Sequence, residues 1–288
     1  MFGRRPDGKL VRDAAPMRRI MPYISPRRNE SVFYLAADVE VEAALEFLEK
    51  RNRERPDDRP ITLFHLLLRS LSQMFALRPG INRFVKGGKL WERDGIQLSF
   101  AAKREMRDGA PMATIKRPFD PDGETLEEMV DGIYGKLRPA RAGVESTSDK
   151  ETKGLVRLPG FATRALIRAA DGLDALGLLP GALIEPDPLY ASMFVANLGS
   201  VKLGGGFHHL WERGTCSTFC VMGKVEAGPG GRRQMRLFYT YDERVEDGLY
   251  ASIALAGNHE RLEKPELLLA SCSELAALGH GTDPGSRG

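Results

Sequence analysis

The order of apolar patterns along the chain limits the folds that are open to it. Apolar residues alternate over 32–39, which predicts a strand, and then recur at helical spacing over 40–55. Further strand patterns lie at 83–86, 89–92, 96–103, 190–196, 217–225 and 233–242, and further helical patterns at 62–78, 124–137, 159–184, 247–262 and 264–278. The elements therefore lack the regular rhythm of a doubly wound parallel sheet. This order predicts one α+β domain, with an antiparallel meander over 83–103.

Positive charge is concentrated near the N-terminus. The 288 residues carry 42 Lys and Arg against 39 Asp and Glu, so the formal net charge of +3 gives no general reason to expect a nucleic-acid partner. We predict that residues 1–15 form a solvated basic arm, 16–279 a single domain and 280–288 a flexible tail. Contact of the arm with nucleic acid or an acidic membrane is the alternative for that segment.

The apolar and cysteine content favours a cytoplasmic protein with no membrane partner. No signal-peptide core follows the N-terminus. The most apolar window, 175–184, is about ten residues long and contains Pro180, which is too short for a membrane span. Three cysteines cannot all pair, and we expect Cys216 and Cys220 to be buried thiols on one face of a strand.

Histidine is scarce, with five in the chain, and the common nucleophile, phosphate-loop and metalloprotease motifs are missing from the sequence. His208 and His209 follow the glycines of 204–206. Because neighbours on an extended segment point to opposite faces, we do not expect them to share a metal ion. We expect no metal site, and we assign both histidines to structural hydrogen bonds or contacts between subunits.

The most informative stretch is 238–248, with the sequence FYTYDERVEDG. It predicts an aromatic strand, a charged turn and a helix that opens at Asp247 and Gly248. An Asp at a helix start commonly caps the helix by accepting hydrogen bonds from its free amides. Capping is therefore the first role expected of Asp247.

Together with other motifs in the same order, this stretch resembles the catalytic domain of the 2-oxoacid dehydrogenase dihydrolipoyl acyltransferases, which shares the fold of chloramphenicol acetyltransferase. The similar motifs, within 16–270, are Met17-Arg-Arg-Ile20, Ile61-Thr-Leu-Phe64, Arg78-Pro-Gly-Ile-Asn82, Asn197-Leu-Gly199, Val221-Met-Gly223, 241–248 and Leu262-Glu-Lys-Pro-Glu-Leu267. The resemblance implies a two-layer sandwich in which helices pack on a mixed sheet.

The resemblance also implies a homotrimer with active sites between subunits, where CoA and an acyl acceptor enter a channel from opposite ends. In that family a motif His is the general base that takes a proton from the attacking thiol or hydroxyl, and this chain has Glu243 there. A Ser or Thr hydroxyl stabilises the oxyanion in the family, and this chain has Ala196 at that position. The motif Asp is retained as Asp247, and Asp242 and Arg244 also match.

The two replacements decide the predicted function. A neutral imidazole titrates near pH 6.5, whereas a glutamate near 4.3 is poorly matched to a thiol near 8.5. Loss of a positioned base costs about 10²–10⁴-fold in rate, and loss of an oxyanion donor about 10²–10³-fold. We therefore predict a catalytically degenerate, trimeric binding or scaffold module, with CoA or acyl-CoA as a candidate ligand. The alternative is an active CoA-dependent acyltransferase with a buried Glu243 as its base and Asn197, or an amide near Gly204, as oxyanion donor.

An insertion at about 140–190 stands where the family has a short connection. It is expected to pack against the sheet, cover the channel entrance or present a docking surface to a protein partner. A lipoyl domain and linker do not precede residue 16, and the segment after Leu269 replaces the apolar end that joins family trimers into cages. We therefore expect a stand-alone trimer.

Overall fold

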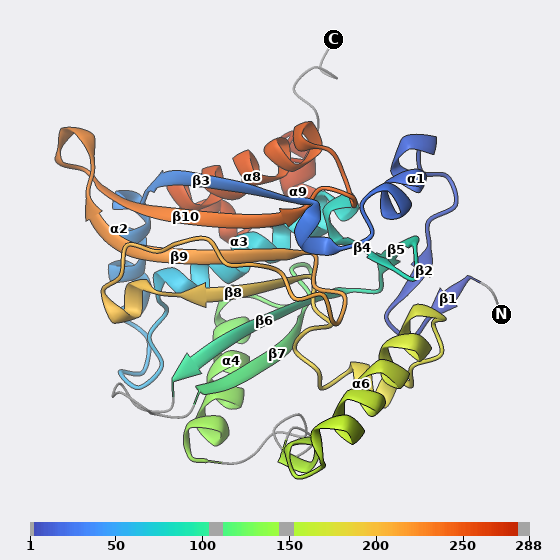
Figure 1. Ribbon diagram of the computed structural model, residues 1–288. Coiled ribbons are helices and arrows are strands. Elements are labelled where there is room, and N and C mark those ends of the chain that lie inside the picture. The colour runs from blue at the N-terminus through green and yellow to red at the C-terminus, as the bar shows by residue number, and fades with distance from the viewer. Residues whose placement is uncertain (1–2, 104–111, 144–152, 282–288) are drawn as a thin grey trace.

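The computed structural model describes residues 3–103, 112–143 and 153–281, and a six-stranded mixed sheet lies at its centre (Figure 1). The strand order is β3-β10-β9-β8-β6-β7. The strands are β3 Val32–Glu40, β6 Ile96–Lys103, β7 Met112–Phe119, β8 Met193–Asn197, β9 Thr218–Ala227 and β10 Arg233–Asp242. Strand β8 is parallel to β6 and to β9, and the other neighbouring pairs are antiparallel. The predicted α+β class is confirmed.

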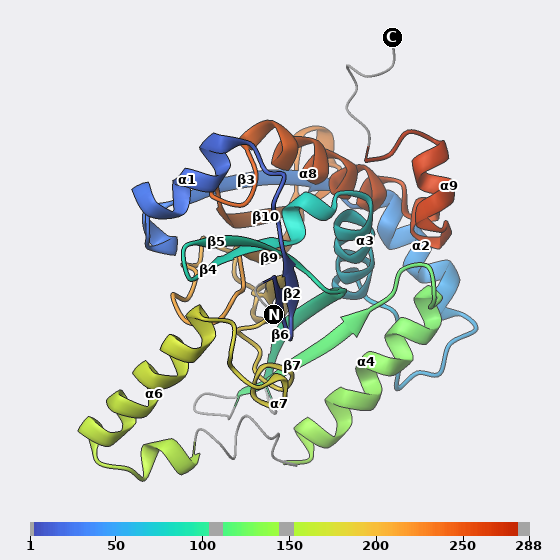
Figure 2. The same ribbon diagram turned by 90° about the vertical axis from the view of Figure 1, so that its right-hand side faces the viewer.

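Helices pack on one face of this sheet and make a two-layer sandwich (Figures 1 and 2). They are α2 Glu42–Asn52, α3 Leu63–Leu77, α4 Leu126–Arg141 and α8 Gly248–Glu263. Helix α3 is apolar on several sides and lies in the main core, where Leu66, Leu67 and Leu71 have no exposed surface. The alternation in β3 places Leu35 and Val39 against the same core.

A smaller sheet with the order β1-β2-β5-β4 lies beside the first. Its strands are β1 Arg4–Arg5, β2 Gly8–Leu10, β4 Arg83–Lys86 and β5 Lys89–Arg93, and helix α1, Pro16–Ile24, lies next to β5. The predicted meander is therefore wrong at its second step, because β6 pairs in the large sheet and not with β5. Gly95, with φ of +72°, turns the chain after β5, and burial of Leu98 and Phe100 in the main core determines where β6 pairs.

The prediction of a solvated N-terminal arm is wrong for Arg5. This side chain in β1 is buried, and its Nη2 lies 2.6 Å from Oδ1 of Asp174, 169 residues further along the chain. Its Nε donates to Asp7 at 2.9 Å. A buried guanidinium is stable only when it is paired, and the sequence pattern does not show a partner so distant.

The insertion forms α6, Gly160–Ala175, and α7, Gly181–Ile184, at the edge of the molecule (Figure 2). Residues 144–152 of the predicted insertion lie outside the described residues. Its C-terminal part is anchored, because Leu179, Ile184 and Tyr190 form a small buried cluster. The other side of α6 is exposed, and the most exposed large apolar residues there are Phe161, Leu166, Leu173 and Leu176. The insertion therefore packs on the body at one end only.

The C-terminal region follows the predicted order with one break. Instead of one helix over 264–278 there are a 3-10 turn, η5 Pro265–Leu269, and the short helix α9, Cys272–Ala277, which Ser271 caps by accepting from the Glu274 amide at 3.2 Å. The other 3-10 turns are η1 Arg28–Glu30, η2 Pro79–Asn82, η3 Gly199–Val201 and η4 Pro229–Gly231. Of the predicted tail, His280 donates its amide to Leu275, and residues 282–288 lie outside the described residues.

Two further predictions from the sequence are tested by the described part of the chain. Within it, no helix combines the length and apolar character needed to cross a bilayer. Cys216 and Cys220 are buried free thiols, as predicted, but they do not share a face, since Cys216 packs in a small cluster on the side of the sheet away from the helices and Cys220 packs in the main core. Cys216 precedes β9, so strand alternation does not extend to it.

Candidate active site

The charged turn after β10 is held by a buried ion pair. Arg244 donates from Nε and Nη2 to the two carboxylate oxygens of Asp242, both at 2.8 Å, and from Nη1 to the carbonyls of Ser25 and Pro26. Both side chains of the pair are almost fully buried. This part of the motif therefore fixes the turn between β10 and α8 to the segment that precedes β3.

Asp247 has the capping role predicted for it. Its Oδ1 accepts a hydrogen bond from the amide of Tyr250 at 2.8 Å at the start of α8. Its Oδ2 lies 4.0 Å from Nη2 of Arg18 in α1. The structure thus explains Asp247 as the N-cap of α8. The guanidinium of Arg18 is a nearby cation.

Glu243 points its side chain into solvent. Its backbone is well held, because its amide donates to the carbonyl of Ser31 at 2.9 Å and its own carbonyl accepts from Arg18. A single chain therefore provides a fixed backbone position for this carboxylate but does not bury it.

Ala196 lines a pocket of about 690 Å³ at the end of β8, which we call the Ala196 pocket. Its wall includes aromatic residues on the face of the sheet away from the main core: Phe194, His208, Trp211 and Phe219. The rings are close, with centroids 5.2 Å apart for Phe194 and Phe219 and 4.2 Å apart for His208 and Phe219. Asn197 and Ser200 add polar groups to the pocket lining at the C-terminal end of β8. The arrangement suits a ligand with a flat, apolar body.

His208 lines the Ala196 pocket, a site role that was not assigned to it from the sequence. Its Nδ1 lies 2.7 Å from the carbonyl oxygen of His209, a distance at which Nδ1–H donates a hydrogen bond to that oxygen. The expected opposite orientation of the two histidines is wrong, since their rings stack with centroids 4.5 Å apart. Within the described residues, no group of three or more ligating side chains forms a metal site. The glycines at 204–206, which free this segment to fold back over the sheet, were the signal in the sequence.

Ala196 and Glu243 lie far apart along the strand direction in one chain: Ala196 is level with the middle of β10, and Glu243 lies just beyond its end. Ala196 is level with Val221 in β9, and Val221 is level with Phe238 in β10. Glu243 follows Phe238 by five residues, or about 17 Å of strand at the usual rise of about 3.4 Å per residue. The two positions can therefore belong to one site only if they come from different copies of the chain.

Solved structures share this arrangement of strands and helices. A probable dihydrolipoamide acetyltransferase from Listeria monocytogenes matches with a TM-score of 0.56 and 16% identity, over 88% of this chain and 95% of that one. A dihydrolipoamide acetyltransferase from Azotobacter vinelandii matches with a TM-score of 0.57 and 16% identity, over 90% and 95%. A chloramphenicol acetyltransferase matches with a TM-score of 0.50 and 11% identity, over 91% and 100%.

The chain has the chloramphenicol acetyltransferase-like fold. No family model and no curated protein matches it. At these identities the likeness establishes the fold alone, so the activity must be argued from the residues of the site.

The described lining of the Ala196 pocket contains no strong cation. Among the described residues, this lining consists of apolar, aromatic and polar side chains without Lys or Arg. Phosphates in protein sites are usually met by Arg or Lys side chains or by helix N-termini. The described lining of a single chain therefore offers no Lys or Arg side chain to a phosphate.

His65, which also lines the Ala196 pocket, predicts an acid-sensitive fold. Burial, and then the nearby charge of Arg55, lowers the pKa of His65 to about 4, while the unfolded value is near 6.5. The neutral ring is therefore favoured in the folded chain, so its contribution is intact above pH 6.5 and is lost as the pH falls toward 4. Through His65, we expect acidification from pH 7 to pH 5 to lower the free energy of unfolding by about 2 kcal/mol.

Urea unfolding at both pH values checks this expectation. The matched variant is His65→Gln, because a Gln side chain can also accept from the Thr62 amide, which is now 3.2 Å from Nδ1. We expect the variant to lose about 2 kcal/mol less than the wild type on acidification. Equal losses in the two proteins would contradict the assignment. The comparison also removes the contribution of His259, whose pKa burial lowers to about 4 in both proteins.

Proposed function

We propose that this chain is a binding module of the chloramphenicol acetyltransferase-like fold that does not carry out acyl transfer. The single observation that carries the proposal is the methyl group of Ala196 in the pocket wall, where the resemblance places the oxyanion hydroxyl. The exposed carboxylate of Glu243, beyond the end of β10, supports it. The retained motif residues Asp242, Arg244 and Asp247 have structural contacts that explain them without catalysis.

The ligand proposed for the Ala196 pocket is a small, uncharged molecule with an aromatic body. The volume of about 690 Å³ lies within the usual range for ligand sites, about 300–1,000 Å³. The stacked rings of Phe194, Phe219 and His208 provide flat apolar surface, and among the described residues the lining has no Lys or Arg to hold a phosphate. CoA or acyl-CoA is then a ligand only of an assembly in which a second copy supplies cations.

The proposal includes a homotrimer in the cytoplasm with a protein partner. The register that separates Ala196 from Glu243 supports assembly, because only neighbouring copies could combine the two positions. The exposed apolar face of α6 supports a protein partner, and the free buried thiols support a reducing compartment. Light scattering should give the mass of three chains. The mass of one chain would contradict the trimer.

A fluorescence experiment tests the ligand site. N-phenyl-1-naphthylamine is an uncharged aromatic probe, and its excitation by energy transfer from Trp211 reports binding in the Ala196 pocket. We expect 1:1 binding that weakens by about tenfold or more in Ala196→Phe, because the larger side chain fills the pocket. In Trp211→Phe only Trp91 remains, so energy transfer should fall while binding persists.

The experiment has a matched control variant and a result that would contradict the proposed ligand site. Tyr34→Phe, on the same face of the sheet but not part of the pocket, should bind the probe as the wild type does. Unchanged binding in Ala196→Phe would show that the probe sits elsewhere. That result would remove the pocket from the proposal.

The second candidate function is an active CoA-dependent acyltransferase with Glu243 as general base. The exposed position of its carboxylate favours this hypothesis in one respect, since the carboxylate is available to the pocket of another copy. His208 offers a different base within the same hypothesis, because its side chain lines the Ala196 pocket. Release of CoA thiol by the wild type and by variants of Glu243 and His208 separates these possibilities.

A further inference from the structure

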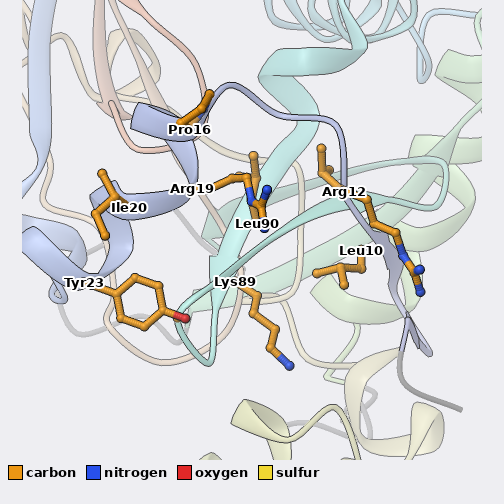
Figure 3. A pocket seen from close by; sticks show the side chains of 10 residues that line it. Leu10, Arg12, Pro16, Arg19, Ile20, Tyr23, Lys89 and Leu90 are labelled. Atoms are coloured by element: carbon orange, nitrogen blue, oxygen red, sulfur yellow. The ribbon is translucent and has the colours of Figure 1, made fainter.

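A second pocket lies beside the small sheet, far along the chain from the residues of the Ala196 pocket. It has a volume of about 720 Å³ and is bounded by α1, by the end of β2 and by the turn between β4 and β5 (Figure 3). We call it the N-terminal pocket. Its apolar floor includes Leu10, Val11, Ile20 and Leu90. The volume is within the range of small-molecule sites, and the floor offers apolar contact.

Three cations line this pocket. They are Arg12, Arg19 and Lys89, and among the described residues no Asp or Glu belongs to the lining. Among residues 3–103, 112–143 and 153–281, no carboxylate forms an ion pair with any of the three. Cations of the adjoining strands are paired, since Arg4 meets Asp94 at 3.6 Å and Lys9 meets Glu92 at 2.9 Å. Within the described part of the chain, the N-terminal pocket therefore combines an apolar floor with uncompensated positive charge.

Figure 3 shows how the charged groups are placed around the floor. The Arg19 side chain lies in front of Leu90, and Tyr23 and Arg12 stand at opposite sides of the pocket. Gly88, with φ of +70°, lets the ring of Tyr23 approach the turn, because a Cβ there would lie 3.3 Å from the ring. A ligand in the pocket would meet Tyr23 on one side, Arg12 on the other and Arg19 between them.

We propose that the N-terminal pocket binds a small amphipathic anion, with an alkyl or aromatic body and a phosphate or carboxylate head. The body would lie on the apolar floor, where contact removes apolar surface from water. The head would be met by Arg19, Lys89 and Arg12. A guanidinium binds phosphate or carboxylate through two parallel hydrogen bonds, and an ammonium contributes a point charge. This site is separate from the Ala196 pocket, whose described lining holds no Lys or Arg.

Calorimetric titration with three probes tests both parts of the ligand. Decyl phosphate, used below its micellar concentration, carries body and head together, decanol carries the body alone, and inorganic phosphate carries the head alone. We expect 1:1 binding of decyl phosphate, at least tenfold tighter than that of either partial probe. Binding of decanol as tight as that of decyl phosphate would overturn the proposed role of the cations.

Charge-reversal variants place the binding in this pocket. The double variant Arg19→Glu/Lys89→Glu should bind decyl phosphate at least tenfold more weakly. The matched control is Arg164→Glu/Arg168→Glu, which changes net charge equally on the exposed side of α6. The milder Arg19→Ala/Lys89→Ala should also weaken binding, and it keeps the test valid if charge reversal disturbs folding. Equal weakening in the α6 control would show a general charge effect and overturn the proposal.

Two other occupants of the N-terminal pocket, a membrane surface and a second copy of the chain, would each give a different result. Sedimentation with phosphatidylglycerol vesicles, without 1:1 binding of soluble decyl phosphate, would replace the small ligand by a membrane surface. A change in the mass of the assembly in Arg19→Ala/Lys89→Ala would show that another copy covers the pocket. Either result overturns the proposal, while unaltered probe binding in Ala196→Phe keeps it distinct from the function proposed above.

Discussion

Replacing Arg5 with Ala is expected to lower the free energy of unfolding by about 3–5 kcal/mol, which is the usual effect of breaking a buried ion pair from one side. The side chain has no exposed surface and pairs with Asp174, which is also fully buried. Burial alone would raise the pKa of Asp174, but Lys86 and Arg5 lower it overall. The variant leaves this carboxylate buried with Lys86, at 2.8 Å, as its remaining cation.

The matched control lies one residue earlier in the same strand. Arg4 is 82% exposed and pairs with Asp94 at 3.6 Å, so Arg4→Ala should cost at most about 1 kcal/mol. Urea unfolding of both variants measures the difference. Similar values for the two would mean that the N-terminal strand is dispensable, as the solvated arm predicted from the sequence would be.

The second large effect concerns the retained part of the motif. Arg244→Ala should lower the unfolding free energy by about 3–5 kcal/mol, because Asp242 then stays buried with only Arg28, 3.6 Å away, as a cation. The same variant also removes the bonds to the carbonyls of Ser25 and Pro26. The expectation assigns these motif residues to stability.

A surface pair with the same geometry provides the control. Arg236 donates from Nε and Nη2 to the two carboxylate oxygens of Asp38, both at 2.6 Å, but both side chains are more than a third exposed. Arg236→Ala should therefore cost about 1 kcal/mol or less. If urea unfolding gave equal costs for Arg236→Ala and Arg244→Ala, burial would not be what makes the motif pair important.

The large sheet and its helices could be predicted because local periodicity agrees with the burial they reach. Strand alternation over 32–39 places Leu35 and Val39 in the core, and the apolar run after Thr62 becomes the buried helix α3. The ordered motifs also predict the fold, although they do not give its strand order. The pairing of β6 could not be predicted in this way, because it depends on which sheet buries Leu98 and Phe100.

The candidate site was predictable only where its residues belong to motifs. Ala196, Glu243 and Asp247 stand out by their places in the sequence, but their separation across the sheet depends on the register of three strands. His208 belongs to a segment that folds back over the sheet, so its contact with Phe219 is long-range packing. The pairing of Arg5 with Asp174 is also a long-range contact and could not be predicted from the sequence. A run of basic residues at a terminus is usually solvated.

Release of CoA thiol from acetyl-CoA, with dihydrolipoamide or chloramphenicol as acceptor, tests the central claim most directly. We expect the wild-type protein to release thiol no faster than the reaction without protein. The double variant Glu243→His/Ala196→Ser, which restores both family groups, measures whether the fold can still position them. Wild-type turnover that disappears in Glu243→Gln would contradict the claim and establish Glu243 as the base. Turnover that disappears in His208→Gln instead would contradict it as well and assign that role to His208.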